Sequence, residues 1–119
     1  MKIVLACVAG LSTTMMMDSM KKVIKDSKAL DESTFELKAI PAEQLPAEIE
    51  GTDVVLLAPQ ISYKKDFVES VTKPRNIPYV VIPKETYGAM DGATVVKEAL
   101  IAQRKQELKN QKEQEGGSN

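Results

Sequence analysis

A single cysteine stands at a chemically suggestive place near the amino terminus of this 119-residue sequence. Cys7 ends an unbroken apolar run that begins at Ile3, and Gly10 follows three positions later. A helical pattern then opens with three consecutive hydroxyl residues, namely Ser12, Thr13 and Thr14. This order predicts a strand, a loop and the amino end of a helix, with a potential nucleophile at the end of the strand.

The amino end of a helix favours a bound anion, because its first N–H groups have no partner within the helix and its dipole adds partial positive charge. Phosphate is the ligand that this arrangement indicates first. Gly10 lets the backbone turn and approach such a ligand closely, while hydroxyl groups donate further hydrogen bonds or cap the helix. We therefore expect a phosphate-binding loop after the first strand, with these candidate ligands: Val8, Ala9, Gly10, Leu11, Ser12, Thr13 and Thr14.

The same positive field would act on the Cys7 thiol. A free thiol has a pKa of about 8.5, and a helix amino end lowers that pKa toward values at which the nucleophilic thiolate dominates at pH 7. A lone cysteine in a core strand is alternatively a small buried hydrophobe. The glycine and the hydroxyl residues that follow favour Cys7 as a catalytic nucleophile.

The composition limits the classes of function. A net charge of -1, with 43% hydrophobic and 28% charged residues, is typical of a soluble domain and gives no electrostatic attraction to nucleic acid. One cysteine cannot form an internal disulfide, and no apolar run of about 18 residues is present, so we expect a cytoplasmic protein without direct membrane insertion. The chain has no histidine, which excludes Cys–His pairs, Ser–His–Asp triads and zinc sites with imidazole ligands.

Strand and helix signals alternate along the rest of the chain. Residues 16–24 carry apolar side chains at helical spacing, residues 35–39 alternate like an edge strand, and a short helix begins or is interrupted at Pro46 within 41–51. Continuous apolar runs at 54–58 and 79–82 predict strands that are covered on both faces. The helix signals after the third strand are Tyr63, Phe67 and Val71, ending before Pro74, and those after a loop over 87–92 are Val95, Val96, Ala99 and Leu100.

This order predicts an α/β fold with a single open four-stranded parallel sheet and helices on both faces. Ligands of such sheets lie beyond the carboxyl ends of the strands. That edge would gather the Cys7 loop, the turn at 59–62 and the loop at 87–92. Gln60 would then contact the loop or the phosphoryl group, or only stabilise its turn; Tyr87 would pack beside the loop or in the core, and Asp91 would cap the last helix.

The carboxyl-terminal part differs in composition. From about residue 104 the chain consists mainly of Lys, Gln and Glu and ends in Gly-Gly-Ser-Asn. We expect one domain over residues 1–105 and a polar tail over 106–119, into which the last helix continues before it frays and becomes disordered.

The pattern strand-Cys-x-x-Gly-x-Ser-Thr-helix resembles the phosphorylation loop of the IIB components of bacterial sugar phosphotransferase systems, in the lactose/cellobiose branch. Two further segments resemble that family: Ala58-Pro59-Gln60-Ile61 after the third strand and Tyr87-Gly88-Ala89-Met90-Asp91-Gly92 before the last helix. The resemblance extends to about residue 105, and only the polar tail departs from it.

The resemblance implies a phosphocysteine carrier, an enzyme of the sugar phosphotransferase class. Cys7 would accept a phosphoryl group from a phosphohistidine of a IIA protein and donate it to a sugar bound by the membrane IIC component. The sugar would be a β-linked disaccharide such as cellobiose or chitobiose. The resemblance implies no metal and no cofactor, and a cytoplasmic location with transient contact at the inner membrane face through IIC. A chain without histidine agrees with a histidine supplied by a partner.

Low-molecular-weight cysteine phosphatases and arsenate reductases share the strand-Cys-loop-helix arrangement and form the alternative class. Their loop carries an arginine six residues after the cysteine, where its planar fork binds phosphate oxygens. Thr13 occupies that position here. A third possibility is a regulatory binding module of the same fold with a loop that cannot be phosphorylated, and Cys7 argues against it.

Overall fold

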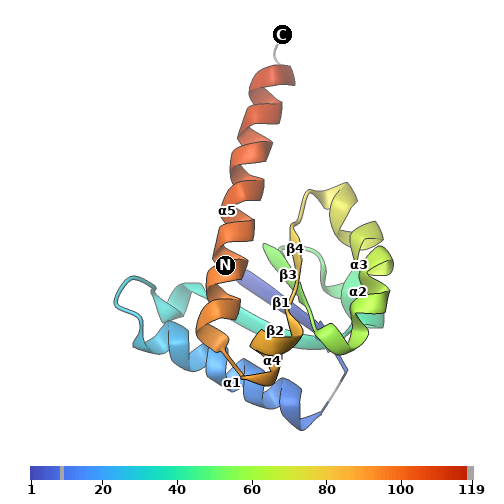
Figure 1. Ribbon diagram of the computed structural model, residues 1–119. Coiled ribbons are helices and arrows are strands. Elements are labelled where there is room, and N and C mark those ends of the chain that lie inside the picture. Colours follow the sequence, from blue (N-terminus) through green and yellow to red (C-terminus); the bar gives the residue numbers. More distant parts are fainter. Residues whose placement is uncertain (9, 118–119) are drawn as a thin grey trace.

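A computed structural model of the chain describes residues 1–8 and 10–117. Its sheet consists of β1 (Lys2–Cys7), β2 (Glu36–Pro41), β3 (Val54–Leu57) and β4 (Tyr79–Val81). The strands lie in the order β2-β1-β3-β4, and each neighbouring pair is parallel (Figure 1). The predicted open four-stranded parallel sheet is therefore confirmed, with β2 at an edge as expected.

Helices cover both faces of this sheet. They are α1 (Leu11–Asp26), α2 (Leu45–Glu48), α3 (Lys65–Thr72), α4 (Lys84–Gly88) and α5 (Gly92–Gly117). α1 packs against α5 on one face, and α2 lies with α3 on the other (Figure 1). Short 3-10 turns complete the chain at Glu32–Thr34, Ala42–Gln44, Pro59–Lys64 and Lys73–Arg75.

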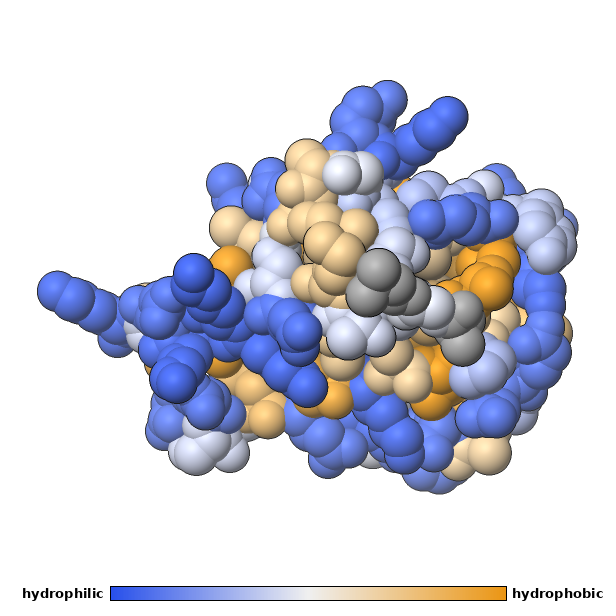
Figure 2. Space-filling model, turned by 90° about the horizontal axis from the view of Figure 1, so that it is seen from below, coloured by the Kyte–Doolittle hydropathy of each residue, from blue (hydrophilic) through white to orange (hydrophobic). Residues whose placement is uncertain are grey.

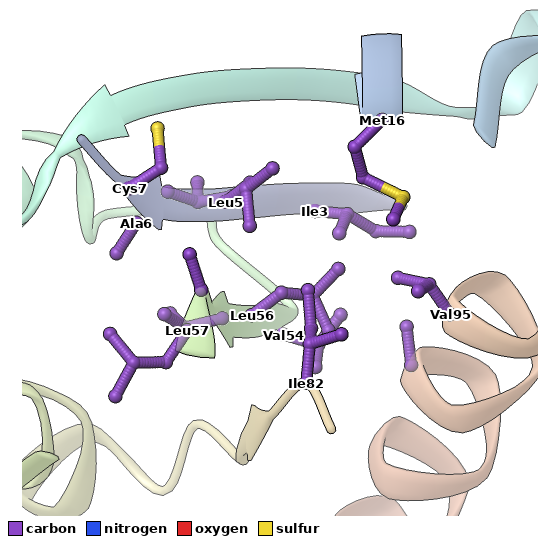
Figure 3. Close-up of a cluster of buried hydrophobic side chains, with 14 of the residues drawn as sticks. Ile3, Leu5, Ala6, Cys7, Met16, Val54, Leu56, Leu57, Ile82 and Val95 are labelled. Atoms are coloured by element: carbon purple, nitrogen blue, oxygen red, sulfur yellow. The ribbon is translucent and has the colours of Figure 1, made fainter. Parts of the chain in front are cut away.

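The two central strands form the core because their continuous apolar runs are covered from both sides. Every residue of β3 is buried, as is every residue of β1 after Lys2. Met16 from α1 and Val95 from α5 pack toward these strands (Figure 3). The Cys7 loop thereby lies between the buried strand β1 and the helix α1.

The predicted apolar face of the crossover helix is wrong in part. α3 is present and ends before Pro74, but it begins only at Lys65, and Tyr63 lies in the preceding 3-10 turn with 76% of its surface exposed. Phe67 is 40% exposed, whereas Val68 is buried. A 3-10 turn advances three residues per turn instead of 3.6 and Ile61 kinks it, so side chains before and after residue 65 do not share one helical face.

The segment 87–92 is not simply a loop. Tyr87 lies within α4, and a turn with Met90 at φ 51° connects α4 to α5. The expectation that Asp91 caps the last helix is confirmed, because its carboxylate accepts hydrogen bonds from the Thr94 N–H at 3.1 Å and the Thr94 hydroxyl at 2.6 Å. The Thr94 hydroxyl, and then its N–H, hold the pKa of Asp91 below the usual aspartate range.

α5 is much longer than its apolar pattern. It passes residue 105 without a break and reaches Gly117, so the polar sequence continues the helix as expected. The upper part of α5 projects beyond the sheet in Figure 1. The division at residue 105 stays a prediction, and the expected disorder at the chain end concerns residues 118 and 119, which lie outside the described residues.

Candidate functional site

The Cys7 side chain lies at the carboxyl end of β1, where β2 also ends. Cys7 pairs with Pro41 in the parallel register, and its sulfur points toward β2 (Figure 3). Only 4% of the residue is exposed, and the thiol donates a hydrogen bond to the Ile40 carbonyl, with 3.5 Å between Sγ and O. The potential nucleophile is thus sheltered by a neighbouring strand.

A small cavity opens directly beside this thiol. Its volume is about 150 Å³, which exceeds the roughly 30 Å³ of a single water molecule several times over. The residues that line it carry no charged side chain: Cys7, Gly10, Thr13, Thr14, Ala39, Ile40 and Pro41. The cavity therefore offers polar donors and space for a tetrahedral phosphoryl group, but no fixed cation from its own wall.

The expected lowering of the Cys7 pKa is wrong for this conformation. Burial is the largest influence and raises the pKa of the thiol, because the charged thiolate is poorly solvated there. The nearby Thr13 side chain, and to a smaller extent the Ile40 backbone, lower the pKa without cancelling the effect of burial. Burial therefore disfavours the charged thiolate of Cys7.

The amino end of α1 retains the donors that an anion needs. Gly10 precedes the helix in extended conformation, with φ 164° and ψ 179°, and no side chain caps α1 within the described residues. The first turn of this 16-residue helix also contains no acidic residue. The Thr14 N–H bonds back to the Gly10 carbonyl at 3.3 Å, so Thr14 is the first residue whose N–H takes part in the hydrogen bonding of the helix.

Thr13 connects the loop to a distant part of the chain. Its hydroxyl donates to the Val8 carbonyl at 2.9 Å and lies 3.5 Å from the hydroxyl of Tyr87. Both side chains are buried, with 6% of Thr13 and 3% of Tyr87 exposed. Tyr87 therefore packs beside the Cys7 loop, which is one of the two positions that the sequence predicted for it.

The other predicted site residues are less closely engaged. The Thr14 hydroxyl bonds to the Gly10 carbonyl at 3.4 Å, whereas no side-chain hydrogen bond of Ser12 or Gln60 is present among the described residues. Gln60 is exposed in the turn after β3, so its role stays a prediction. Val8 and the backbone of Leu11 border the loop, and Ala9 lies outside the described residues.

Sequence reasoning missed the contribution of β2 to the site. Ala39, Ile40 and Pro41 form one wall of the cavity, although the predicted strand ended at residue 39 and no role in the site was predicted for it. The available signal was indirect: a parallel edge strand beside β1 must end near Cys7. The register that brings Ile40 to the thiol depends on tertiary packing, which alternation alone does not specify.

Apolar surface borders the loop on its solvent side. Val8 is 60% exposed and Met15, in the first turns of α1, is 48% exposed. Seen from below, the face that includes α1 has weakly polar and apolar surface in its central part, flanked by strongly hydrophilic surface (Figure 2). Such a border is suited to contact with another protein.

The described residues contain no group of three or more histidine, cysteine or acidic side chains placed to hold a metal ion. None of their helices is both long and apolar enough to span a membrane.

Comparison with known proteins places the chain in one family. Residues 2–98 match the family described as PTS system, Lactose/Cellobiose specific IIB subunit. The oligo-beta-mannoside-specific EIIB component of the PTS system of Bacillus subtilis is 30% identical over 99 residues, which cover 83% of this chain and 92% of that protein. The cellobiose-specific EIIB component of Lactococcus lactis subsp. lactis is 31% identical, with 79% and 88% covered.

Two further relatives extend this result. The galactose-specific EIIB component of Lactococcus lactis subsp. cremoris is 31% identical over 79% of this chain and 88% of its own length. The solution structure of the cellobiose-specific phosphotransferase IIB component from Borrelia burgdorferi superposes with a TM-score of 0.73 at 37% identity, covering 89% of this chain and 94% of that one. The chain therefore belongs to the lactose/cellobiose-specific IIB subunits of the sugar phosphotransferase system.

Proposed function

We propose that this IIB component carries its phosphoryl group on Cys7, accepting it from a phosphohistidine of a IIA protein and donating it to a sugar bound by a membrane IIC component. The observation that carries the proposal is the position of Cys7. Its thiol faces a cavity bounded by the uncapped amino end of α1, where a phosphoryl dianion is favoured. The contact with IIC would bring this cytoplasmic chain transiently to the inner membrane face.

The first transfer forms an S–P bond while the N–P bond of the phosphohistidine breaks. The departing imidazole nitrogen keeps the electron pair of that bond and can take the proton of the Cys7 thiol. A thiol whose pKa is raised by burial can take part in this exchange, because it needs to lose its proton only after the phosphohistidine of the IIA protein has docked. Backbone N–H groups at the start of α1 and the Thr13 hydroxyl would then hold the phosphoryl oxygens.

The second transfer reverses the role of the sulfur. A sugar hydroxyl oxygen attacks phosphorus, the O–P bond forms, and the S–P bond breaks with its electrons returning to Cys7. The hydroxyl proton passes to a base supplied with the sugar. The same amide donors stabilise the charge that spreads over the phosphoryl oxygens in both directions.

The sugar is proposed from the names of the relatives. They are specific for oligo-β-mannoside, cellobiose and galactose, respectively. We infer a β-linked disaccharide such as cellobiose or chitobiose for this chain, without a metal or cofactor.

A chase experiment tests the whole transfer. The phosphorylated chain, freed of its donor proteins, is mixed with membrane vesicles that contain a IIC permease of the same branch and with cellobiose, chitobiose, mannobiose or galactose. We expect a sugar phosphate to appear as the phosphorylated chain disappears, with a β-linked disaccharide as the best acceptor. Loss of the phosphoryl group only as inorganic phosphate with every sugar would contradict the carrier role.

The isolated chain is expected to show negligible hydrolysis of aryl phosphates. Thr13 occupies the position of the phosphatase arginine, and no charged side chain lines the cavity to drive attack by water. Release of nitrophenol from nitrophenyl phosphate, compared with the same assay after thiol alkylation, measures this directly. Rapid hydrolysis that depends on Cys7 would favour the phosphatase class instead.

Gly10→Val is expected to slow phosphoryl transfer on the order of tenfold while leaving the unfolding free energy within about 0.5 kcal/mol of the wild type. A Cβ at Gly10 meets no atom within 4 Å and its backbone is extended, so the folded chain tolerates a side chain. The added methyl groups would occupy space beside the phosphoryl group. Ala47→Val, at an exposed position of α2, is the control, and unchanged transfer by the folded Gly10 variant would place the phosphate elsewhere.

A further inference from the structure

A buried phenol reaches the Cys7 loop from an element far away in the sequence. Tyr87 lies on α4, 3% exposed, and its hydroxyl is 3.5 Å from the Thr13 hydroxyl, 74 positions apart in the chain. No other side-chain hydrogen bond of Tyr87 is present in the described part of the chain. A buried phenol needs a hydrogen-bond partner, and the Thr13 hydroxyl of the Cys7 loop provides it here.

The number of protons on the Thr13 hydroxyl decides which of the two hydroxyls donates in the contact between Thr13 and Tyr87. The Thr13 hydroxyl has a single proton, and in the resting structure that proton is donated to the Val8 carbonyl at 2.9 Å. A carbonyl oxygen can only accept. The Tyr87 hydroxyl must therefore donate to the Thr13 oxygen. The single Thr13 proton can then be donated either to the Val8 carbonyl or to another acceptor.

Cys7 and Thr13 line the same cavity, so a charged group on the Cys7 sulfur is a second acceptor available to the Thr13 hydroxyl. A neutral thiol is a weak acceptor, so the Val8 carbonyl holds the proton at rest. A thiolate or a phosphoryl oxygen carries negative charge and accepts a shorter, stronger hydrogen bond than a carbonyl does.

We propose that Tyr87 is a positioning residue for phosphoryl transfer: its hydroxyl holds the Thr13 oxygen while the Thr13 proton moves from the Val8 carbonyl to the charged group on Cys7. This inference rests on the proposed phosphocysteine function. The Thr13 hydroxyl would thus stabilise an anion in addition to the backbone amides, in a cavity whose wall has no charged side chain. The titratable side chains involved are Cys7 and Tyr87, since α1 and β2 contribute only uncharged residues to the cavity wall.

Tyr87→Phe tests the proposal, because phenylalanine keeps the buried ring and removes only the hydroxyl. We expect phosphorylation by the IIA protein to slow about two- to tenfold, the size of one neutral hydrogen bond. The Cys7 pKa, measured from the pH dependence of alkylation by iodoacetamide, should rise further. Tyr79→Phe is the matched control, since Tyr79 donates to Glu69 at 3.2 Å, outside the cavity wall, and should leave both quantities unchanged.

A double-mutant cycle shows whether Tyr87 acts through Thr13. Thr13→Val removes the middle hydroxyl at nearly constant volume, and in that background Tyr87→Phe should have no further effect on the rate or on the thiol pKa. Thr13→Ser, which keeps a hydroxyl, should restore most of the rate and serves as the test if Tyr87→Phe does not fold.

The outcomes separate this inference from the function on which it rests. If the wild type accepts phosphate and Tyr87→Phe behaves like the wild type in both measurements, the positioning role is wrong and the carrier function stands. Equal losses from Tyr87→Phe with and without the Thr13 hydroxyl would also overturn it. A wild-type chain that accepts no phosphate would instead contradict the proposed function itself.

Discussion

Cys7→Ser is expected to abolish phosphoryl acceptance while the chain stays folded. Serine has nearly the volume of cysteine and fits the same buried position at the end of β1. Its hydroxyl does not ionise near pH 7, and burial beside Ile40 gives it no base to activate it. The loss should be on the order of a thousandfold or more, as for other covalent nucleophiles. Incorporation of label from radioactive phosphoenolpyruvate through the IIA protein measures it.

The folded state of the Cys7 variant is checked separately by urea denaturation. Its unfolding midpoint should stay close to that of the wild type, because the substitution changes neither the packing of β1 nor the start of α1. Labelling of Cys7→Ser at a rate near that of the wild type would move the phosphoryl group to another residue.

Gly92→Ala is expected to lower the free energy of unfolding by about 3 kcal/mol, at the upper end of overpacking effects. α5 begins so close to α1 that a Cβ at Gly92 would lie 2.4 Å from Ser19 Oγ and 2.7 Å from the Met20 backbone nitrogen. The Gly92 N–H also donates to Ser19 Oγ at 3.1 Å, and Ser19 in turn donates to the Met90 carbonyl at 2.9 Å. Separating the two helices would disturb all of these contacts.

Urea denaturation followed by circular dichroism measures this loss. Gly88→Ala is the matched control, since a Cβ there meets no atom within 4 Å and Gly88 ends α4. The control should unfold at a midpoint close to the wild type. If Gly92→Ala did the same, the close approach of α5 to α1 would not be a feature of the folded chain in solution.

The central part of the fold could be predicted from the sequence because its strands are short, continuous and apolar. The runs ending at Cys7 and near Ala58 are buried on both faces, and a parallel sheet is the arrangement that provides this burial. The position of the Cys7 loop at the sheet edge followed from the same order of elements. These features depend on local pattern, which the sequence displays directly.

The features that could not be predicted depend on contacts between distant segments. The exposure of Phe67 depends on which face of α3 packs on the core, and that face carries Val68 instead. The contact between Tyr87 and Thr13 requires α4 to fold back on the loop, where only a loop was expected.

The direction of the Cys7 pKa shift also depends on a contact between distant segments. The place of the thiol beside a helix amino end suggested a lowered pKa, yet the neighbouring strand buries the sulfur and burial raises the pKa. The burial of the sulfur depends on how β2 pairs with β1 beside Cys7, which is a matter of register rather than of residue type. A prediction from residue types alone therefore placed Cys7 at the end of the strand and missed the direction of its pKa shift.

The intact mass of the chain after phosphorylation tests the central claim most directly. The wild-type protein is incubated with phosphoenolpyruvate, the general phosphotransferase proteins and a IIA protein. The masses of the intact chain and of its proteolytic peptides are then measured under conditions that preserve phosphocysteine. The account predicts a mass increase of one phosphoryl group, located on the peptide that contains Cys7 and absent when the IIA protein is omitted. An unchanged mass, or a phosphoryl group on any other residue, would contradict it.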